Sequence, residues 1–181
     1  MLRKYFATRV TPIEQVRQTV WKSLDNSNPS DENKEFERII ILEQYKLYVE
    51  MADRISARRS LTNTFFLSLN TAIFASIAAL WTGKAATQPW VLVFPLLALL
   101  TQCFAWFFVV RAYRQLNSAK YTVIGLLEER LPASPYWRAE WAALGEGKDK
   151  TKYWPMTHLE QWIPVLFALT YIGGFVAALA S

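Results

Sequence analysis

The side chains that most often do acid–base or metal chemistry are scarce in this chain. One histidine, His158, and one cysteine, Cys103, occur among its 181 residues. A zinc cluster needs three or four such ligands, and a catalytic histidine needs a nucleophile and an orienting group within reach. We therefore expect no metal, no cofactor and no catalytic residue, and we predict that the protein is not an enzyme. His158 is expected to be structural or interfacial.

The segment from Gly145 to Lys150 superficially resembles a phosphate-binding loop. In that motif a serine or threonine follows the lysine, but Asp149 follows Lys148 here. Ala142 also stands where the leading glycine is required. We therefore do not expect nucleotide binding at this segment.

The formal net charge of +5 does not indicate nucleic-acid binding. A nucleic-acid module gathers Lys and Arg on one face with few acidic residues among them. Residues 1–60 instead carry eleven basic and nine acidic side chains. This composition predicts a mixed, solvated surface and no nucleic-acid partner.

Polar side chains inside two long apolar runs are more informative. Between Leu61 and Val110 the only charged residue is Lys84. Polar groups in such runs either bond to neighbouring helices or line a water-filled path, and both readings remain open here. The candidates for these two roles are Asn63, Ser68, Asn70, Thr71 and Gln102.

The two apolar runs have the length of membrane-spanning helices. Leu61–Trp81 and Trp90–Val110 each cover about 31 Å as a helix, which matches a hydrocarbon core of about 30 Å. The polar segment Thr82–Pro89 between them predicts a tight hairpin turn. A third span is predicted from Trp162 to Ala180, although a short interfacial or re-entrant helix would also fit. A capping box of Thr157 and Glu160 is expected to begin it.

Basic residues near the ends of the spans predict the orientation. Loops on the cytoplasmic side of a membrane carry an excess of Lys and Arg. Opposite the single Lys84 of the turn stand Arg54, Arg58, Arg59, Arg111, Arg114 and Lys120. The N-terminus is therefore expected in the cytoplasm and the turn outside.

Helical patterns continue beyond the spans. Thr11 and Pro12 predict a helix start, and no Gly or Pro interrupts the chain between about Asn33 and Trp81. The second span is expected to continue to Leu131, and Ser134 is expected to cap a short helix after it. The fold class is an all-α membrane protein, a long antiparallel helical hairpin extending from the membrane into the cytoplasm. Its expected regions are cytoplasmic helices at 1–60, a transmembrane hairpin at 61–112, further cytoplasmic helices at 113–156, and a C-terminal membrane helix at 157–181.

An apolar stripe precedes the first span. Its members alternate spacings of four and three residues, which is typical of a helix that packs against a partner. They are Ile41, Tyr45, Tyr48, Ala52 and Ile55. Because Ile40, Leu47 and Met51 widen the stripe, this helix is expected to have more than one neighbour. The stripe is predicted to be an oligomeric seam.

Several stretches resemble a known family. They are YKLYVEMADRIS (45–56), NTFFLSLNTA (63–72), YRQLNSAKY (113–121) and LEERLP (127–132). Together they resemble the bacterial RipA family of octameric membrane proteins over about residues 40–132. The first is also similar to the small two-span effector modules of bacterial defence systems.

The resemblance implies a homo-octameric, multi-pass protein of the bacterial inner membrane, with lipids and its own copies as partners. On this basis we predict a pore-like or conduit assembly with a cytoplasmic vestibule. The alternative is a structural or signalling scaffold that recruits a soluble cytoplasmic partner without transport.

Overall fold

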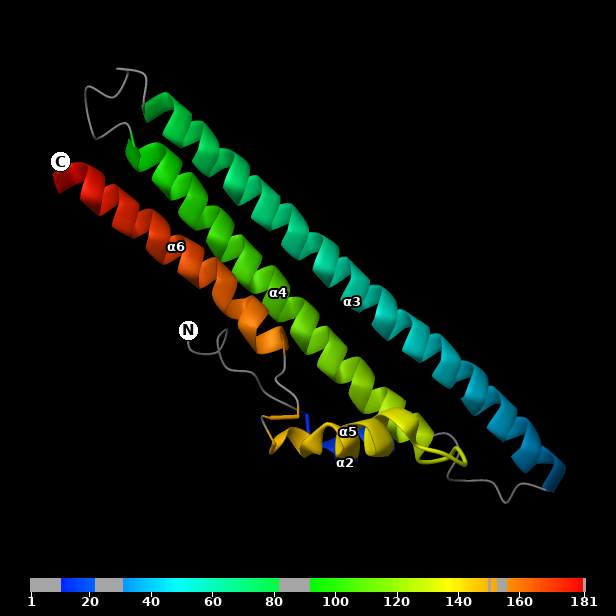
Figure 1. The fold of residues 1–181 in the computed structure, drawn as a ribbon. Coiled ribbons are helices and arrows are strands. Elements are labelled where there is room, and N and C mark those ends of the chain that lie inside the picture. Colours follow the sequence, from blue (N-terminus) through cyan, green and yellow to red (C-terminus); the bar gives the residue numbers. More distant parts are fainter. Residues whose placement is uncertain (1–10, 22–30, 82–91, 150, 153–155, 181) are drawn as a thin grey trace. The chain divides into compact units, whose positions relative to one another are not determined.

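The computed structural model describes residues 11–21, 31–81, 92–149, 151–152 and 156–180 (Figure 1). Within these ranges the chain forms helices and turns and no strand. In chain order the elements are α2 (Ile13–Trp21), α3 (Asp31–Trp81), α4 (Val93–Glu128), the π-helical turn η2 (Pro135–Glu140), α5 (Trp141–Ala143), the 3₁₀ turn η3 (Gly145–Gly147) and α6 (Met156–Ala180). The all-α fold class is confirmed.

The longest element, α3, is one continuous helix of 51 residues. It contains no glycine or proline, so no residue removes a backbone hydrogen bond from its interior. Among the described residues, the helices long and apolar enough to cross a membrane lie at Lys34–Ala79, Val93–Glu128 and Leu159–Ala180. These agree with the predicted hairpin and the predicted third span. The expected turn, Thr82–Pro89, lies outside the described residues.

The third of these helices, α6, continues through residues that often interrupt helices. Pro164 lies inside it and is buried, and Gly173 and Gly174 follow without a break. The helix begins at Met156, so the prediction that Thr157 is its N-cap was wrong: Thr157 lies within the first turn.

The end of α4 also differs from expectation. The helix ends at Glu128 rather than Leu131. After it, the backbone tightens into turns in which Arg130 N–H donates to Leu127 O and Leu131 N–H donates to Glu128 O. Such i→i+3 bonds are a common way to satisfy carbonyls at a helix end. Pro132 is therefore preceded by a turn, not by helix.

Backbone contacts divide the chain into two compact units. Unit 1 comprises Met1–Ala52 with Ser118–Lys152, and unit 2 comprises Asp53–Asn117 with Tyr153–Ser181. The core of unit 1 is formed by Trp21, Ile41 and Leu127. The core of unit 2 is formed by Leu99, Cys103 and Tyr171. Each unit thus combines segments far apart in the sequence.

Within unit 2, α3 and α4 run antiparallel and α6 runs parallel to α3. Asn63 on α3 bonds to Trp106 on α4, while Ser56, earlier on α3, bonds to Asn117, later on α4. On α6, Glu160 pairs with Arg59 and Tyr171 bonds to Asn70, so the two helices advance together.

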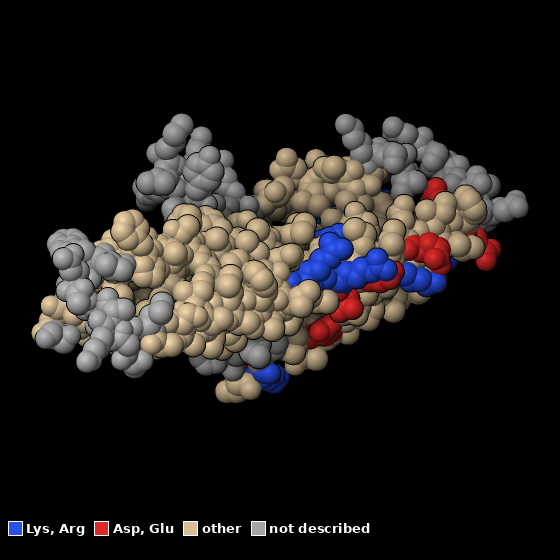
Figure 2. All heavy atoms as spheres, turned by 90° about the horizontal axis from the view of Figure 1, so that it is seen from above, with Lys and Arg blue, Asp and Glu red and all other residues tan. Residues whose placement is uncertain are grey.

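Charged side chains are unevenly distributed over the surface. In Figure 2 the Lys, Arg, Asp and Glu residues gather on one part of the visible face, and the broad tan part shows none. This follows the sequence, because Leu61–Trp81, Val93–Val110 and Gln161–Ala180 contain no charged residue.

Candidate functional site

In unit 1, four consecutive residues at the junction of α4 and the turn after it make four different contacts. Leu127 belongs to the core, and Glu128 is buried at 2% exposure. Glu129 pairs with Arg17, and the guanidinium of Arg130 lies 3.9 Å from the ring centroid of Trp21. These residues fix α2 and the segment after α4 to the helix end. Glu128, Glu129 and Arg130 belong to a stretch that carries the family resemblance, and no role was predicted for them from the sequence.

The Glu128 carboxylate organises the turn that follows α4. Among the described residues, four donors reach it. Tyr45 Oη and Tyr136 N donate to Oε1, both at 3.0 Å, and Ser134 Oγ (2.6 Å) and Trp137 N (2.9 Å) donate to Oε2. The carboxylate therefore accepts the first free N–H groups of η2, as a cap does. Ser134 was expected to be that cap, but it makes no side-chain capping bond and instead donates to Glu128.

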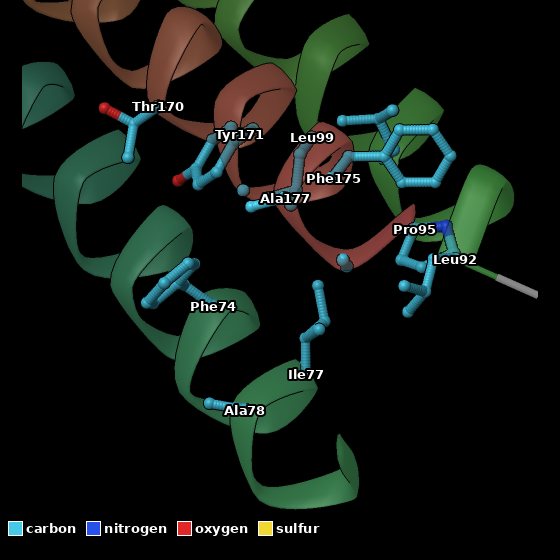
Figure 3. A pocket seen from close by; sticks show the side chains of 13 residues that line it. Phe74, Ile77, Ala78, Leu92, Pro95, Leu99, Thr170, Tyr171, Phe175 and Ala177 are labelled. Atoms are coloured by element: carbon cyan, nitrogen blue, oxygen red, sulfur yellow. The ribbon is translucent and has the colours of Figure 1, made fainter. Parts of the chain in front are cut away.

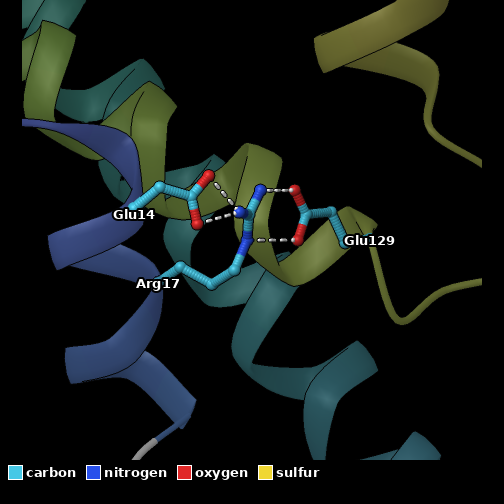
Figure 4. A network of polar contacts seen from close by, with 3 residues as sticks. All are labelled: Glu14, Arg17 and Glu129. Carbon is cyan, nitrogen blue, oxygen red and sulfur yellow. Dashed lines mark hydrogen bonds and ion pairs between the residues drawn. The ribbon is translucent and has the colours of Figure 1, made fainter.

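An exposed ion-pair network joins α2 to the end of α4 (Figure 4). Arg17 Nη2 lies 2.7 Å from Glu129 Oε1, and Arg17 Nε donates to Glu129 Oε2 at 3.1 Å. The same guanidinium also pairs with Glu14, one turn earlier on α2. Glu129, and to a smaller extent Glu14, raise the pKa of Arg17. Arg17 thus stays charged and bridges two carboxylates.

Gly125 lets Trp137 approach the backbone of α4. A Cβ built on Gly125 would lie 2.4 Å from Cδ2 and 2.5 Å from Cε3 of the Trp137 ring. Real Cβ atoms do not approach other atoms this closely, so no larger residue fits here without displacing the ring. No sequence signal distinguished this glycine from one that is merely tolerated in a helix.

The predicted seam residues of unit 1 face the chain's own core. Ile41 and Ala52 are 5% and 2% exposed. Tyr45 and Tyr48 pack against the cluster of Trp21, Ile41 and Leu127. We call Ile41, Tyr45, Tyr48 and Ala52 the inner stripe. Ile55, the last predicted seam residue, lies half-buried in unit 2. A role of these residues between copies stays a prediction.

A second apolar stripe on α3 remains exposed in unit 1. At 100° per residue its members fall within about 60° of one another, centred about 120° around the helix from the inner stripe. We call it the outer stripe. It comprises Phe36 (65% exposed), Ile40, Leu47 (54% exposed) and Met51.

In unit 2, Asn70 connects all three helices. It is fully buried, its Nδ2 donates to Phe66 O of its own helix at 2.8 Å, and its Oδ1 accepts the Tyr171 hydroxyl at 2.9 Å. Cys103 Sγ lies 3.8 Å from the same oxygen. A polar group inside an apolar bundle needs such partners. Asn70 was among the candidates predicted from the sequence, whereas no sequence pattern indicated Tyr171.

The other polar residues predicted for the spans are placed differently. Asn63 Oδ1 accepts the indole N–H of buried Trp106 at 2.9 Å. Ser68 and Thr71 are exposed, and Thr71 donates to Leu67 O in its own helix. Among the described residues, Gln102 Nε2 is buried without a hydrogen-bond partner. Thus Asn63 and Asn70 are engaged between helices of one chain, and lining of a pore stays a prediction for the set.

Replacing Asn70 by leucine is expected to destabilise unit 2 by about 1–2 kcal/mol, because the buried Tyr171 hydroxyl loses its acceptor. The measurement is the midpoint of thermal unfolding in mild detergent, monitored by near-UV circular dichroism. Thr71→Val is the matched control, since Thr71 is exposed and bonds only within its own helix. An unchanged midpoint for Asn70→Leu would show that these bonds do not hold the bundle together.

Polar contacts also connect the three helices of unit 2 near the predicted span boundaries at Leu61, Val110 and Trp162. Arg59 Nε lies 3.3 Å from Glu160 Oε2, and Arg114 Nη1 donates to Gln161 at 3.1 Å. Asn117 Nδ2 donates to Ser56 Oγ at 3.2 Å. Glu160, expected to serve in a capping box, therefore pairs with Arg59 of α3.

Groups that could bind a metal ion do not converge in the described part of the chain. No three His, Cys, Asp or Glu residues there could hold a metal ion. In the glycine-containing loop, Lys148 Nζ lies 2.7 Å from Glu146 Oε2, and this contact lowers the pKa of Glu146. The loop lysine is thus paired within its own loop. The side chain of His158 lies outside the described residues.

The model of the octameric membrane protein family (8xMP) matches residues 42–180. Neither the curated proteins nor the solved structures contain a significant match to the chain.

Proposed function

The chain belongs to the octameric membrane protein family, and on this premise we propose that eight copies assemble in the bacterial inner membrane through the outer stripe of α3. The family name describes octamers, and the motifs quoted above lie within the matched residues 42–180. The N-terminus is taken to be cytoplasmic, so that unit 1 would surround a cytoplasmic vestibule. No catalytic step is part of the proposal.

The exposure of the outer stripe is the main observation that supports this proposal. The inner stripe packs on the core of its own chain, so the apolar side chains on that side of α3 are already covered. Phe36, Ile40, Leu47 and Met51 remain exposed on another side of the same helix. An exposed apolar stripe in a region with many charged residues is typical of a surface that binds a partner. A ring of identical copies provides that partner for every protomer.

The mass of the complex in mild detergent tests the assembly. Native mass spectrometry of the full chain should give about 167 kDa, eight times the 20.9 kDa of one copy. Leu47→Glu should abolish the octamer at the same protein concentration, because it would bury an unpaired charge in each interface. Leu42→Glu is the matched control, since Leu42 is exposed on α3 but lies about 100° or more around the helix from every outer-stripe residue. An octamer that survives Leu47→Glu would refute the proposed contact.

We further propose that the assembly acts as a conduit. The spans contain no charged residue, while Ser68 and Thr71 present hydroxyl side chains on the exposed surface of α3. A ring lined by such groups would be polar, neutral and weakly selective for charge. Ion flux through the octamer reconstituted in liposomes tests this step, with Leu47→Glu as the unassembled control.

The alternative function is a scaffold that recruits a soluble partner. It is favoured by exposed aromatic residues after α4, namely Tyr136, Trp137 and Trp141. Tyrosine and tryptophan are enriched at the centres of protein interfaces. An intact octamer that passes no ions would reject the conduit and leave this function.

A further inference from the structure

An apolar cavity of about 590 Å³ opens between the three helices of unit 2 (Figure 3). Phe74 and Ile77 of α3, Leu99 of α4 and Phe175 of α6 line it. It reaches from Thr170 to Ala178 along α6, which are eight helical steps, or about 12 Å, apart. The residues that line it lie in helices that are apolar and long enough to cross a membrane, except Leu92, which directly precedes α4.

The chemistry of the walls favours a hydrocarbon. The hydroxyls at the cavity are already engaged, since Thr170 Oγ1 donates to Leu166 O and Tyr171 Oη donates to Asn70 Oδ1. The rest of the side chains that line it are apolar. A polar ligand would therefore lose its bonds to water without gaining equivalent ones.

Gly174 widens the cavity. A Cβ built on Gly174 would meet no atom within 4 Å, and the same holds for Gly173 next to it. Only Gly174 of the two lines the cavity. The two glycines thus differ in position but not in the local room for a side chain.

Two apolar occupants are available in a membrane, a helix of another copy and a single hydrocarbon chain. A helix with its side chains is rigid and about 10 Å wide. A single hydrocarbon chain is narrower and flexible, and the membrane around these helices supplies it at high concentration.

We propose that this cavity binds one hydrocarbon chain of a membrane lipid, with Gly174 providing part of the room. The lipid enters from the bilayer beside the ends of α3 and α6, and its chain extends toward Leu99 and Tyr171. The bound lipid then fills a hollow that the protein leaves between its own helices.

Photolabelling of the full chain tests the proposal. The protein is reconstituted in vesicles of phosphatidylethanolamine and phosphatidylglycerol, in which some phosphatidylglycerol carries a diazirine in the middle of one acyl chain. Labelled residues are located by mass spectrometry after illumination. Ile77 and Leu96 in the cavity should be labelled more strongly than Phe104 and Leu166, which are exposed elsewhere on the bundle.

Matched variants separate a bound lipid from the surrounding bilayer. Gly174→Leu should lower cavity labelling about tenfold, the effect expected when overpacking costs about 1.4 kcal/mol. Gly173→Leu should leave it unchanged. If Gly174→Leu does not fold, Ala177→Leu gives the same test, because Ala177 also lines the cavity.

Equal labelling of cavity and outer surface, or no effect of both filling variants, would overturn the proposal. The mass of each sample is measured in parallel. A failed octamer with retained cavity labelling would reject only the proposed assembly, and an intact octamer without cavity labelling would reject only the lipid site.

Discussion

Replacing Glu128 by glutamine is expected to speed amide exchange at Tyr136 and Trp137 by roughly 100-fold, which corresponds to about 3 kcal/mol of lost local stability. The carboxylate accepts bonds from these two N–H groups and from the hydroxyls of Tyr45 and Ser134. Glutamine has nearly the same shape, but its NH₂ group donates and would face two of these donors. Hydrogen–deuterium exchange with mass spectrometry measures the effect directly.

Glu129→Gln is the matched control for this experiment. It makes the same chemical change at the next residue, but Glu129 and its partner Arg17 are both partly exposed. Ion pairs at such sites are screened by water and contribute little. Exchange at Tyr136 and Trp137 should therefore change little. Similar exchange in both variants would mean that Glu128 does not hold this turn.

Gly125→Ala should destabilise unit 1 by about 2 kcal/mol, because the added methyl group would overlap the Trp137 ring. The sign is informative, since glycine to alanine in a helix interior ordinarily stabilises by up to about 1 kcal/mol. The ring has limited freedom to move away, because the backbone N–H of Trp137 is bonded to Glu128 and holds the residue in place. The thermal midpoint in mild detergent is the measurement.

Gly173→Ala provides the opposite case within the same protein. A Cβ at Gly173 meets no atom within 4 Å, so only the gain in helix propensity remains. Its midpoint should be unchanged or higher. If Gly125→Ala behaved in the same way, the close approach of Trp137 would have no energetic consequence.

The sequence was sufficient to predict the long helices. The absence of glycine and proline between Asn33 and Trp81 predicted α3 to within two residues at its start, and the apolar runs indicated the three candidate spans. These properties are local, because helix formation and membrane compatibility depend on residues close in sequence. The family resemblance also predicted membership of an octameric membrane protein family, and the family match confirms it.

Contacts between distant segments could not be predicted in this way. An apolar stripe such as Ile41, Tyr45 and Tyr48 has the same spacing whether it faces its own chain or another copy. Similarly, Ser134 has the residue type and position of a helix N-cap. Glu128 instead accepts the bonds from the first N–H groups of η2, because the end of α4 lies beside η2. Such assignments depend on which elements meet, and the pattern of a single helix does not contain that information.

The outer stripe has a consequence for the life of a single copy. In a single copy Phe36, Ile40, Leu47 and Met51 are exposed, and in the proposed octamer they are covered. Exposed apolar segments of this kind are recognised by chaperones and proteases, which act on incompletely assembled proteins. A copy made in excess would thus remain marked for removal until it joined a ring, so the surface that builds the complex would also limit how many orphan subunits the cell retains.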